Sequence, residues 1–200
     1  MFLKKTSTFL IFLAIFFSCI SKVYSIEPDI FVQSTVNRAS EALNNKFSRE
    51  NKIERLKEIA SETVDINGIG YYTLGAYRKN LSDNEINQYE MLFEQYFLKS
   101  FSSRLAEYSN PEIEVVSKKK LNENYTMVSS ILVGTEQRPE VEINWRIYTK
   151  KPENPLIRDL IIEGLSLART QKEEFSSILN SNDGDINSLF KTLKKFSENK

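Results

Sequence analysis

Residues 139–147 read PEVEINWRI and alternate strictly between apolar and polar side chains. Successive side chains of a β-strand point to opposite faces of a sheet, so a strand here has one apolar and one wet face. That pattern is typical of an antiparallel sheet that is covered on one side only. The stretch therefore predicts a strand whose covered face consists of Val141, Ile143, Trp145 and Ile147.

The same two-residue period continues on both sides of this strand. Upstream, after Pro111, the alternating apolar residues predict two strands and are Ile113, Val115, Tyr125, Met127, Ile131 and Val133. Downstream, the stretch from Leu156 to about Leu167 predicts one more strand. Together these segments predict a four-stranded antiparallel meander.

A period of three to four residues replaces the period of two before residue 111. The best-marked helix begins at Ser82, because Ser82 and Glu85 have the spacing of a capping box. We expect it to continue to Asn110–Pro111, with a face that consists of Ile86, Tyr89, Phe93, Tyr96, Phe97, Phe101, Leu105 and Tyr108. The sequence thus predicts a long helix with an aromatic stripe.

Shorter helical patterns surround this long helix and the strands. Before it, helices are expected from Pro28 to Leu43, from Ile53 to Val64 and, after the glycines of residues 67–70 interrupt the pattern, around Tyr71–Tyr77. After the strands, Thr170 and Glu173 predict a helix start, and a last helix should bury Ile186, Leu189, Phe190, Leu193 and Phe196. The predicted class is α+β, with helices wrapped on one face of the sheet.

The N-terminus has the three parts of a secretory signal peptide. Lys4 and Lys5 precede an apolar run from Phe9 to Phe17, and a small-residue exit ends at Ser25. We therefore expect residues 1–25 to be a cleaved leader and residues 26–200 to form a single domain. Lipoprotein processing at Cys19 is the alternative, although only Ser18 among the three residues before it is small.

The composition excludes several function classes. Removal of the leader takes away three lysines and leaves 24 basic against 27 acidic residues, so no basic field favours nucleic acid. The chain has no histidine, and its one cysteine lies in the leader, so most metal and triad chemistry is unavailable. Ser166, in a sequence similar to a nucleophile elbow, lacks a histidine partner, and a carboxylate pair of Asp159 with Glu163 has no local support. We expect no enzyme, no metal and no cofactor.

Several separated segments together resemble one family, the toluene-tolerance or Mla periplasmic phospholipid-binding family (MlaC-like). They are residues 74–77 (LGAY), the capped helix with Phe93 and Phe97, residues 104–108 (RLAEY) and residues 159–167 (DLIIEGLSL). The resemblance runs from about residue 30 to residue 196. It departs from the family pattern at Arg78, where a tryptophan is usual, and at Gln171 and Lys172, where tyrosine and arginine are usual.

The resemblance implies a periplasmic shuttle that carries phospholipid between an inner-membrane ABC transporter complex and an outer-membrane lipoprotein and porin complex, which maintains outer-membrane lipid asymmetry. The acyl chains would lie in an apolar cavity between the helices and the sheet. The lining residues expected are Tyr89, Phe93, Phe97, Phe101, Val141, Ile143, Trp145 and Ile147. A carrier of another apolar lipid such as a hopanoid, and a protein adaptor with a solid core, are the alternatives.

Overall fold

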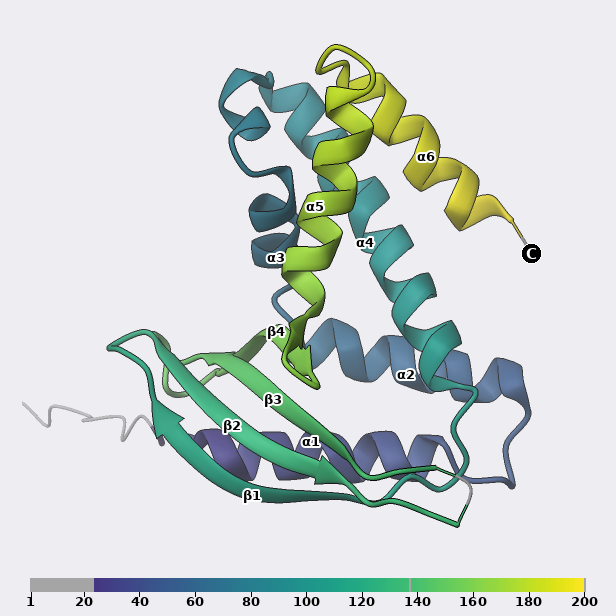
Figure 1. The fold of residues 1–200 in the computed structure, drawn as a ribbon, viewed down its shortest axis with the longest axis vertical. Helices are drawn as coiled ribbons and strands as arrows, with labels where there is room; N and C mark the ends of the chain where they lie inside the picture. Colours follow the sequence, from purple (N-terminus) through teal and green to yellow (C-terminus); the bar gives the residue numbers. More distant parts are fainter. Residues whose placement is uncertain (1–23, 137, 200) are drawn as a thin grey trace, which may run out of the picture.

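The computed structural model describes residues 24–136 and 138–199 and confirms the α+β class (Figure 1). The predicted leader therefore lies almost entirely outside the described residues. The helices are α1 (Pro28–Ala42), α2 (Arg49–Thr63), α3 (Ile66–Leu74), the 3₁₀ helix η1 (Tyr77–Asn80), α4 (Asp83–Leu105), α5 (Leu167–Asn180) and α6 (Ile186–Glu198). The antiparallel sheet has the order β1 (Ile113–Lys120), β2 (Tyr125–Leu132), β3 (Val141–Tyr148), β4 (Leu156–Ile162) and β5 (Leu165–Ser166).

The sheet register decides which side chains face the core. On β3, Ile143, Trp145 and Ile147 are buried, as the alternation predicted. Their partners on β2 are Ser130, Val128 and Thr126, and partnered residues of an antiparallel pair lie on the same face. The inner face of β2 is therefore partly polar, and the more apolar set that begins with Tyr125 and Met127 lies on the other face.

The last predicted strand is in fact two strands. The chain turns at Glu163–Gly164, with φ values of 49° and 80°, and returns as the short strand β5. Two consecutive left-handed residues are what a tight two-residue hairpin requires. The prediction of four strands is therefore one too few, because Glu163 adopts a backbone conformation that its side chain does not favour.

The start of α4 is as the sequence predicted. The Ser82 hydroxyl accepts a hydrogen bond from the Glu85 backbone N–H, and the Ser82 backbone N–H donates to the Glu85 carboxylate. The helix ends at Leu105, however, so that Tyr108 lies in the connection to β1. Beyond that end the chain has left the helix: Asn110 has a φ of 46°, and its N–H bonds to the Leu43 carbonyl next to α1.

α2, α3 and α5 all begin earlier than predicted, and the last two of them are capped from segments paired with the sheet. α3 starts at Ile66, with Asp65 as the N-cap, and contains the glycines expected to interrupt it. α5 starts at Leu167 with Ser166 as the N-cap, so Thr170 lies inside the helix. In both cases the capping side chain is at the end of a segment paired with the sheet, and the pairing places the cap.

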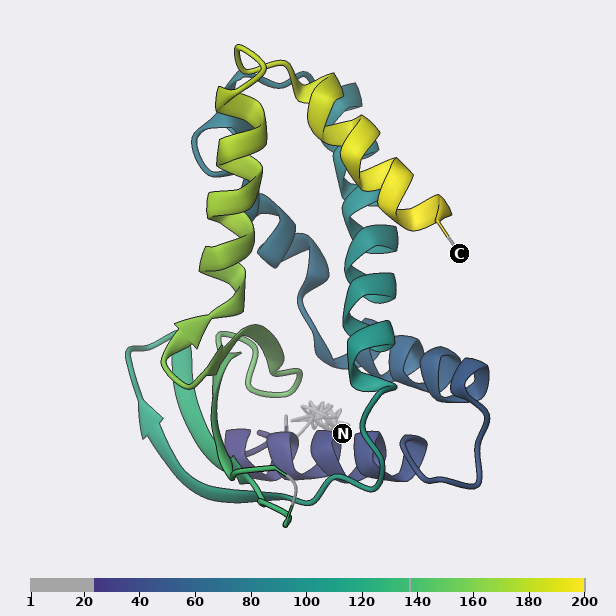
Figure 2. The same cartoon turned by 45° about the vertical axis from the view of Figure 1, so that its right-hand side comes forward.

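Helices of two kinds surround the core. α1, α3 and α5 contact the sheet, whereas α4 makes its main contacts with α2, α3 and α6. α4 runs from the helix-only end of the molecule down to the level of the sheet (Figures 1 and 2). On α6 the predicted buried face is confirmed except for Phe196, which is 39% exposed and packs on Tyr96.

Candidate functional site

The aromatic stripe of α4 forms a continuous ladder of rings. The ring centroids of Tyr89 and Phe93 are 5.6 Å apart, those of Phe93 and Phe97 are 6.0 Å apart, and those of Phe97 and Phe101 are 5.7 Å apart. Residues four apart lie on one face of an α-helix, which explains why the sequence period produces this contact series. The structure thus brings together the four predicted residues of α4.

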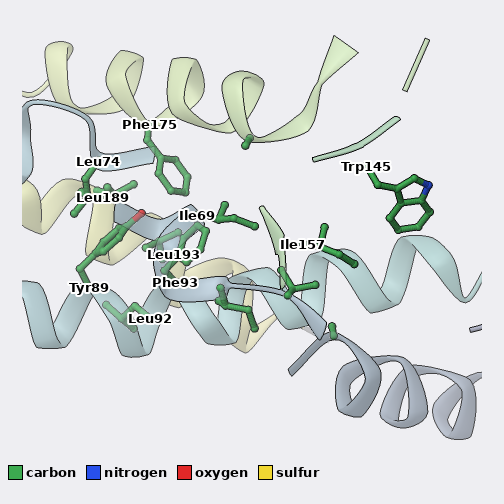
Figure 3. Close-up of a cluster of buried hydrophobic side chains, with 14 of the residues drawn as sticks. Ile69, Leu74, Tyr89, Leu92, Phe93, Trp145, Ile157, Phe175, Leu189 and Leu193 are labelled. Carbon is green, nitrogen blue, oxygen red and sulfur yellow. The ribbon is translucent and has the colours of Figure 1, made fainter. Parts of the chain in front are cut away.

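The upper half of the ladder, which consists of Tyr89 and Phe93, is part of a filled core. Tyr89 is 1% exposed and Phe93 is 2% exposed, and Phe93 meets Phe175 of α5 edge-on at 6.2 Å (Figure 3). Burial raises the pKa of Tyr89 above its ordinary value of 10.0, and its hydroxyl lies 2.8 Å from the hydroxyl of Thr73. Tyr89 and Phe93 are therefore enclosed by protein.

The lower half of the ladder is different, because its apolar side chains are only partly buried. Phe97 and Phe101 stack with an interplanar angle of 8° and remain partly exposed, although both pack against the main hydrophobic cluster. Leu98 shares this intermediate burial. The half of α4 that reaches the level of the sheet therefore has an apolar surface that the rest of the protein covers only in part.

The sheet presents the second apolar surface. Val141 is partly exposed, whereas Ile143, Trp145 and Ile147 are buried. The register places Leu160 opposite Trp145 and Ile162 opposite Ile143, and both are partly buried apolar residues of the same cluster. Sequence analysis did not select Leu160 and Ile162, and only strand pairing could have found them.

Trp145 carries the one polar side-chain group on this apolar face of β3. Its indole N–H donates a hydrogen bond of 2.8 Å to the hydroxyl of Ser130, and that hydroxyl donates in turn to the Ile143 carbonyl. Figure 3 shows Trp145 at one end of the cluster, apart from Tyr89 and Phe93. A buried indole N–H needs such a partner, so Ser130 fixes the Trp145 ring in the apolar face of the sheet.

Two surface hollows of the described residues lie elsewhere. One of about 700 Å³ runs between α3 and α5 and includes Tyr72, Arg169 and Lys172. Another of about 410 Å³ lies between α4 and α6 and includes Met91 and Phe190. Neither contains a predicted lining residue, so an enclosed cavity between the helices and the sheet stays a prediction.

Two of the three positions that depart from the family pattern lie on α5 and have defined partners. Gln171 accepts a hydrogen bond of 2.8 Å from the Tyr96 hydroxyl. Lys172 holds its ammonium 5.0 Å from the centre of the Tyr72 ring, which is a cation–π contact. Both residues therefore tie α5 to its neighbouring helices.

The candidate catalytic residues have structural partners. Asp159 is buried and accepts hydrogen bonds from the Ser166 hydroxyl and the Ala168 backbone N–H, at 2.6 Å and 3.0 Å. Glu163 is exposed in the turn and accepts from the Glu142 backbone N–H at 2.7 Å. Asp159 and Ser166 thus hold the start of α5. Within residues 24–136 and 138–199, no acidic or cysteine cluster is arranged to hold a metal.

Known proteins share this arrangement of helices and sheet. The family model described as MlaC protein matches residues 33–195. A solved structure described as the phospholipid-binding protein from Ralstonia solanacearum, in complex with a phospholipid, superposes with a TM-score of 0.71 at 16% identity. The alignment covers 86% of this chain and 97% of that chain. No curated protein matches the chain, and none of the described helices is long and apolar enough to cross a membrane.

Proposed function

Since the chain belongs to the MlaC family, we propose that it binds phospholipid, with the acyl chains between the lower half of α4 and the inner face of the sheet. One observation carries this proposal: apolar side chains on both surfaces are left partly exposed, with Phe97 and Phe101 on the helix and Val141 and Leu160 on the sheet. Protein interiors are otherwise close-packed. The structure from Ralstonia solanacearum, described as a phospholipid complex, has the same fold and supports the assignment.

The physical advantage of such a site is the burial of methylene groups. Each buried methylene is worth about 0.8 kcal/mol, so two acyl chains would cost on the order of 20 kcal/mol to expose to water. A carrier has to enclose the chains, whereas the headgroup can stay hydrated. The proposed activity needs no reaction at the lipid, so we infer that the protein is not an enzyme and returns its lipid chemically unchanged.

The proposal extends to a role in transport. We infer that the protein is exported to the periplasm after cleavage at Ser25 and moves phospholipid between an inner-membrane ABC transporter complex and an outer-membrane complex. Osmotic-shock release of a protein whose first residue is Ile26 would support export and cleavage. A membrane-bound product that is modified at Cys19 would contradict a freely diffusing carrier.

Lipid identification tests the binding itself. The protein would be purified without detergent, extracted with organic solvent and analysed by mass spectrometry, and the emptied protein would be offered phospholipid vesicles. We expect phospholipid in the extract and renewed uptake from vesicles. A hopanoid or another apolar lipid in its place would change the cargo, and an empty protein that takes up nothing would contradict the proposal and favour an adaptor.

A charge in the wall gives the matching mutational test. Val141→Lys places an ammonium among the proposed acyl chains, where an unpaired charge is strongly disfavoured. We expect bound phospholipid per protein to fall by about tenfold or more, which corresponds to a loss of about 1.4 kcal/mol. Val116→Lys is the control, because Val116 is 57% exposed on the edge strand β1. An equal loss of bound phospholipid in both variants would contradict the proposal that the acyl chains lie against Val141.

A further inference from the structure

Two consecutive rings of the α4 ladder differ in their surroundings. Phe93 is 2% exposed, whereas Phe97, one helical turn nearer the level of the sheet, is partly exposed. Their ring centroids are only 6.0 Å apart. The boundary between the buried core and the partly exposed apolar surface of α4 therefore runs between these two side chains.

Phe93 is held in place from several elements. Behind it, Gly70 of α3 comes so close that a Cβ at Gly70 would lie 2.9 Å from Cδ1 of Phe93. Phe175 of α5 meets the ring edge-on at an interplanar angle of 88°, and Tyr89 stacks on it. A close-packed interior yields little to a penetrating group, so Phe93 is a fixed obstacle.

Phe97 is held more loosely than Phe93. The ring contacts described for Phe97 are those to Phe93 and Phe101, which both belong to α4. Its neighbour Phe101 stacks nearly parallel to it and is partly exposed as well. Phe97 is thus the partly exposed ring of the ladder that lies next to the buried Phe93.

We propose that Phe93 closes the inner end of the lipid site and that the bulk of Phe97 in front of it sets the longest acyl chain that fits. This inference rests on the proposed function. A chain that lies along Phe101 and Phe97 ends at Phe93, because the core behind that ring is filled. Removal of the Phe97 ring adds depth of about one helical turn, 5.4 Å, in front of the same obstacle.

Competition between phospholipids of graded chain length tests this. Emptied protein is mixed with vesicles that contain equal amounts of phosphatidylglycerols with successively longer saturated chains, and the bound species are identified by mass spectrometry. In the vesicle every methylene is already out of water, so the general gain from longer chains cancels and the bound distribution reports the fit. We expect the wild-type protein to discriminate against chains beyond a limiting length.

The variants predict opposite shifts of that limit. Phe97→Ala should move it to longer chains by about two to four carbons, since the added depth is about one helical turn, and Phe97→Trp should move it to shorter chains. Phe196→Ala is the matched control, because Phe196 is 39% exposed and its ring packs on Tyr96, which is not a member of the ladder. We expect this control to keep the wild-type limit.

The outcomes separate the two proposals. If no variant and no wild-type protein takes up phospholipid, the proposed function itself fails. If all of them bind phospholipid and the chain-length limit is the same in wild type, Phe97→Ala and Phe97→Trp, the role of Phe97 is overturned while lipid binding stands. When Phe97 is substituted, Phe93 keeps its contacts with Gly70, Phe175 and Tyr89, so the filled core behind Phe93 stays in place.

Discussion

Arg158 of β4 and Asp65 at the start of α3 form an ion pair in which the Arg158 guanidinium donates at 2.6 Å to one Asp65 oxygen. The other oxygen of Asp65 accepts the Gly68 backbone N–H at 2.8 Å. Arg158 also lies 4.4 Å from the centre of the Tyr148 ring. One carboxylate therefore caps the helix and holds it to the sheet at the same time.

Substitution of Asp65 should separate these two roles. Asp65→Asn keeps an oxygen for the cap and loses the charge, so we expect a fall of about 1 kcal/mol in the free energy of unfolding. Asp65→Ala also loses the cap, and we expect a fall of about 2–3 kcal/mol. Urea denaturation measures both. The exposed pair of Arg38 and Glu62 is the control, and Glu62→Gln should cost under about 1 kcal/mol.

Gly70→Ala tests the crowding behind Phe93. An alanine is favoured over glycine inside a helix by about 1 kcal/mol, but overpacking of a core costs about 1–3 kcal/mol. We expect the variant to be less stable by about 1 kcal/mol in chemical denaturation, because the new Cβ would meet Phe93 at 2.9 Å. In a Phe93→Leu background the same change should cost less. An equal cost in both backgrounds would remove Phe93 as the cause.

Ser130→Ala tests the hydrogen bond within the wall. The substitution leaves the buried Trp145 indole N–H without the partner it has at 2.8 Å, so we expect a loss of about 1–3 kcal/mol in the free energy of unfolding. Ser129→Ala is the matched control, since Ser129 is partly buried and bonds Asn144 instead. We expect a smaller loss there. A larger loss for Ser129→Ala would contradict the role given to Ser130.

Alkaline stability should depend on Tyr89. Burial raises the pKa of the Tyr89 hydroxyl in the folded protein above its value in the unfolded chain. The neutral hydroxyl therefore contributes its full stability below the ordinary pKa of 10.0, and this stability is lost as the pH rises further, because the unfolded chain ionises first. Tyr89→Phe cannot ionise, and we expect its stability to fall less steeply above pH 10.0 than that of the wild-type protein. Tyr96, whose pKa is also raised by burial, keeps some slope in the variant. Thermal unfolding across alkaline pH measures this, and identical slopes would contradict it.

Local signals in the sequence were sufficient for the elements that they define. The capping box at Ser82 and the alternation from Val141 to Ile147 depend only on neighbours in the chain, and both predictions are confirmed. The extent of α3 was missed because Gly68 and Gly70 look like breaks. Close contacts in the fold explain these glycines instead: a Cβ at Gly68 would lie 2.6 Å from the Arg158 guanidinium, and one at Gly70 would lie 2.9 Å from Phe93, and both partners are distant in sequence.

The candidate site could be predicted in part. Helical spacing selected the α4 ladder, but it could not distinguish the buried Phe93 from the partly exposed Phe97. That difference depends on Gly70 of α3 and Phe175 of α5, which contact Phe93 and are distant from it in sequence. Leu160 and Ile162 were missed because their facing depends on strand register and on the turn at Glu163, neither of which the period reveals.

Trp145 is the only tryptophan in the chain, and the structure places it in the sheet wall of the proposed lipid site. Its indole emission responds to the polarity of the surroundings and is not overlaid by a second indole. The protein therefore contains its own optical reporter at the surface where the lipid is proposed to lie. Filling and emptying can be timed on the unmodified molecule, without a label that would compete for the same space.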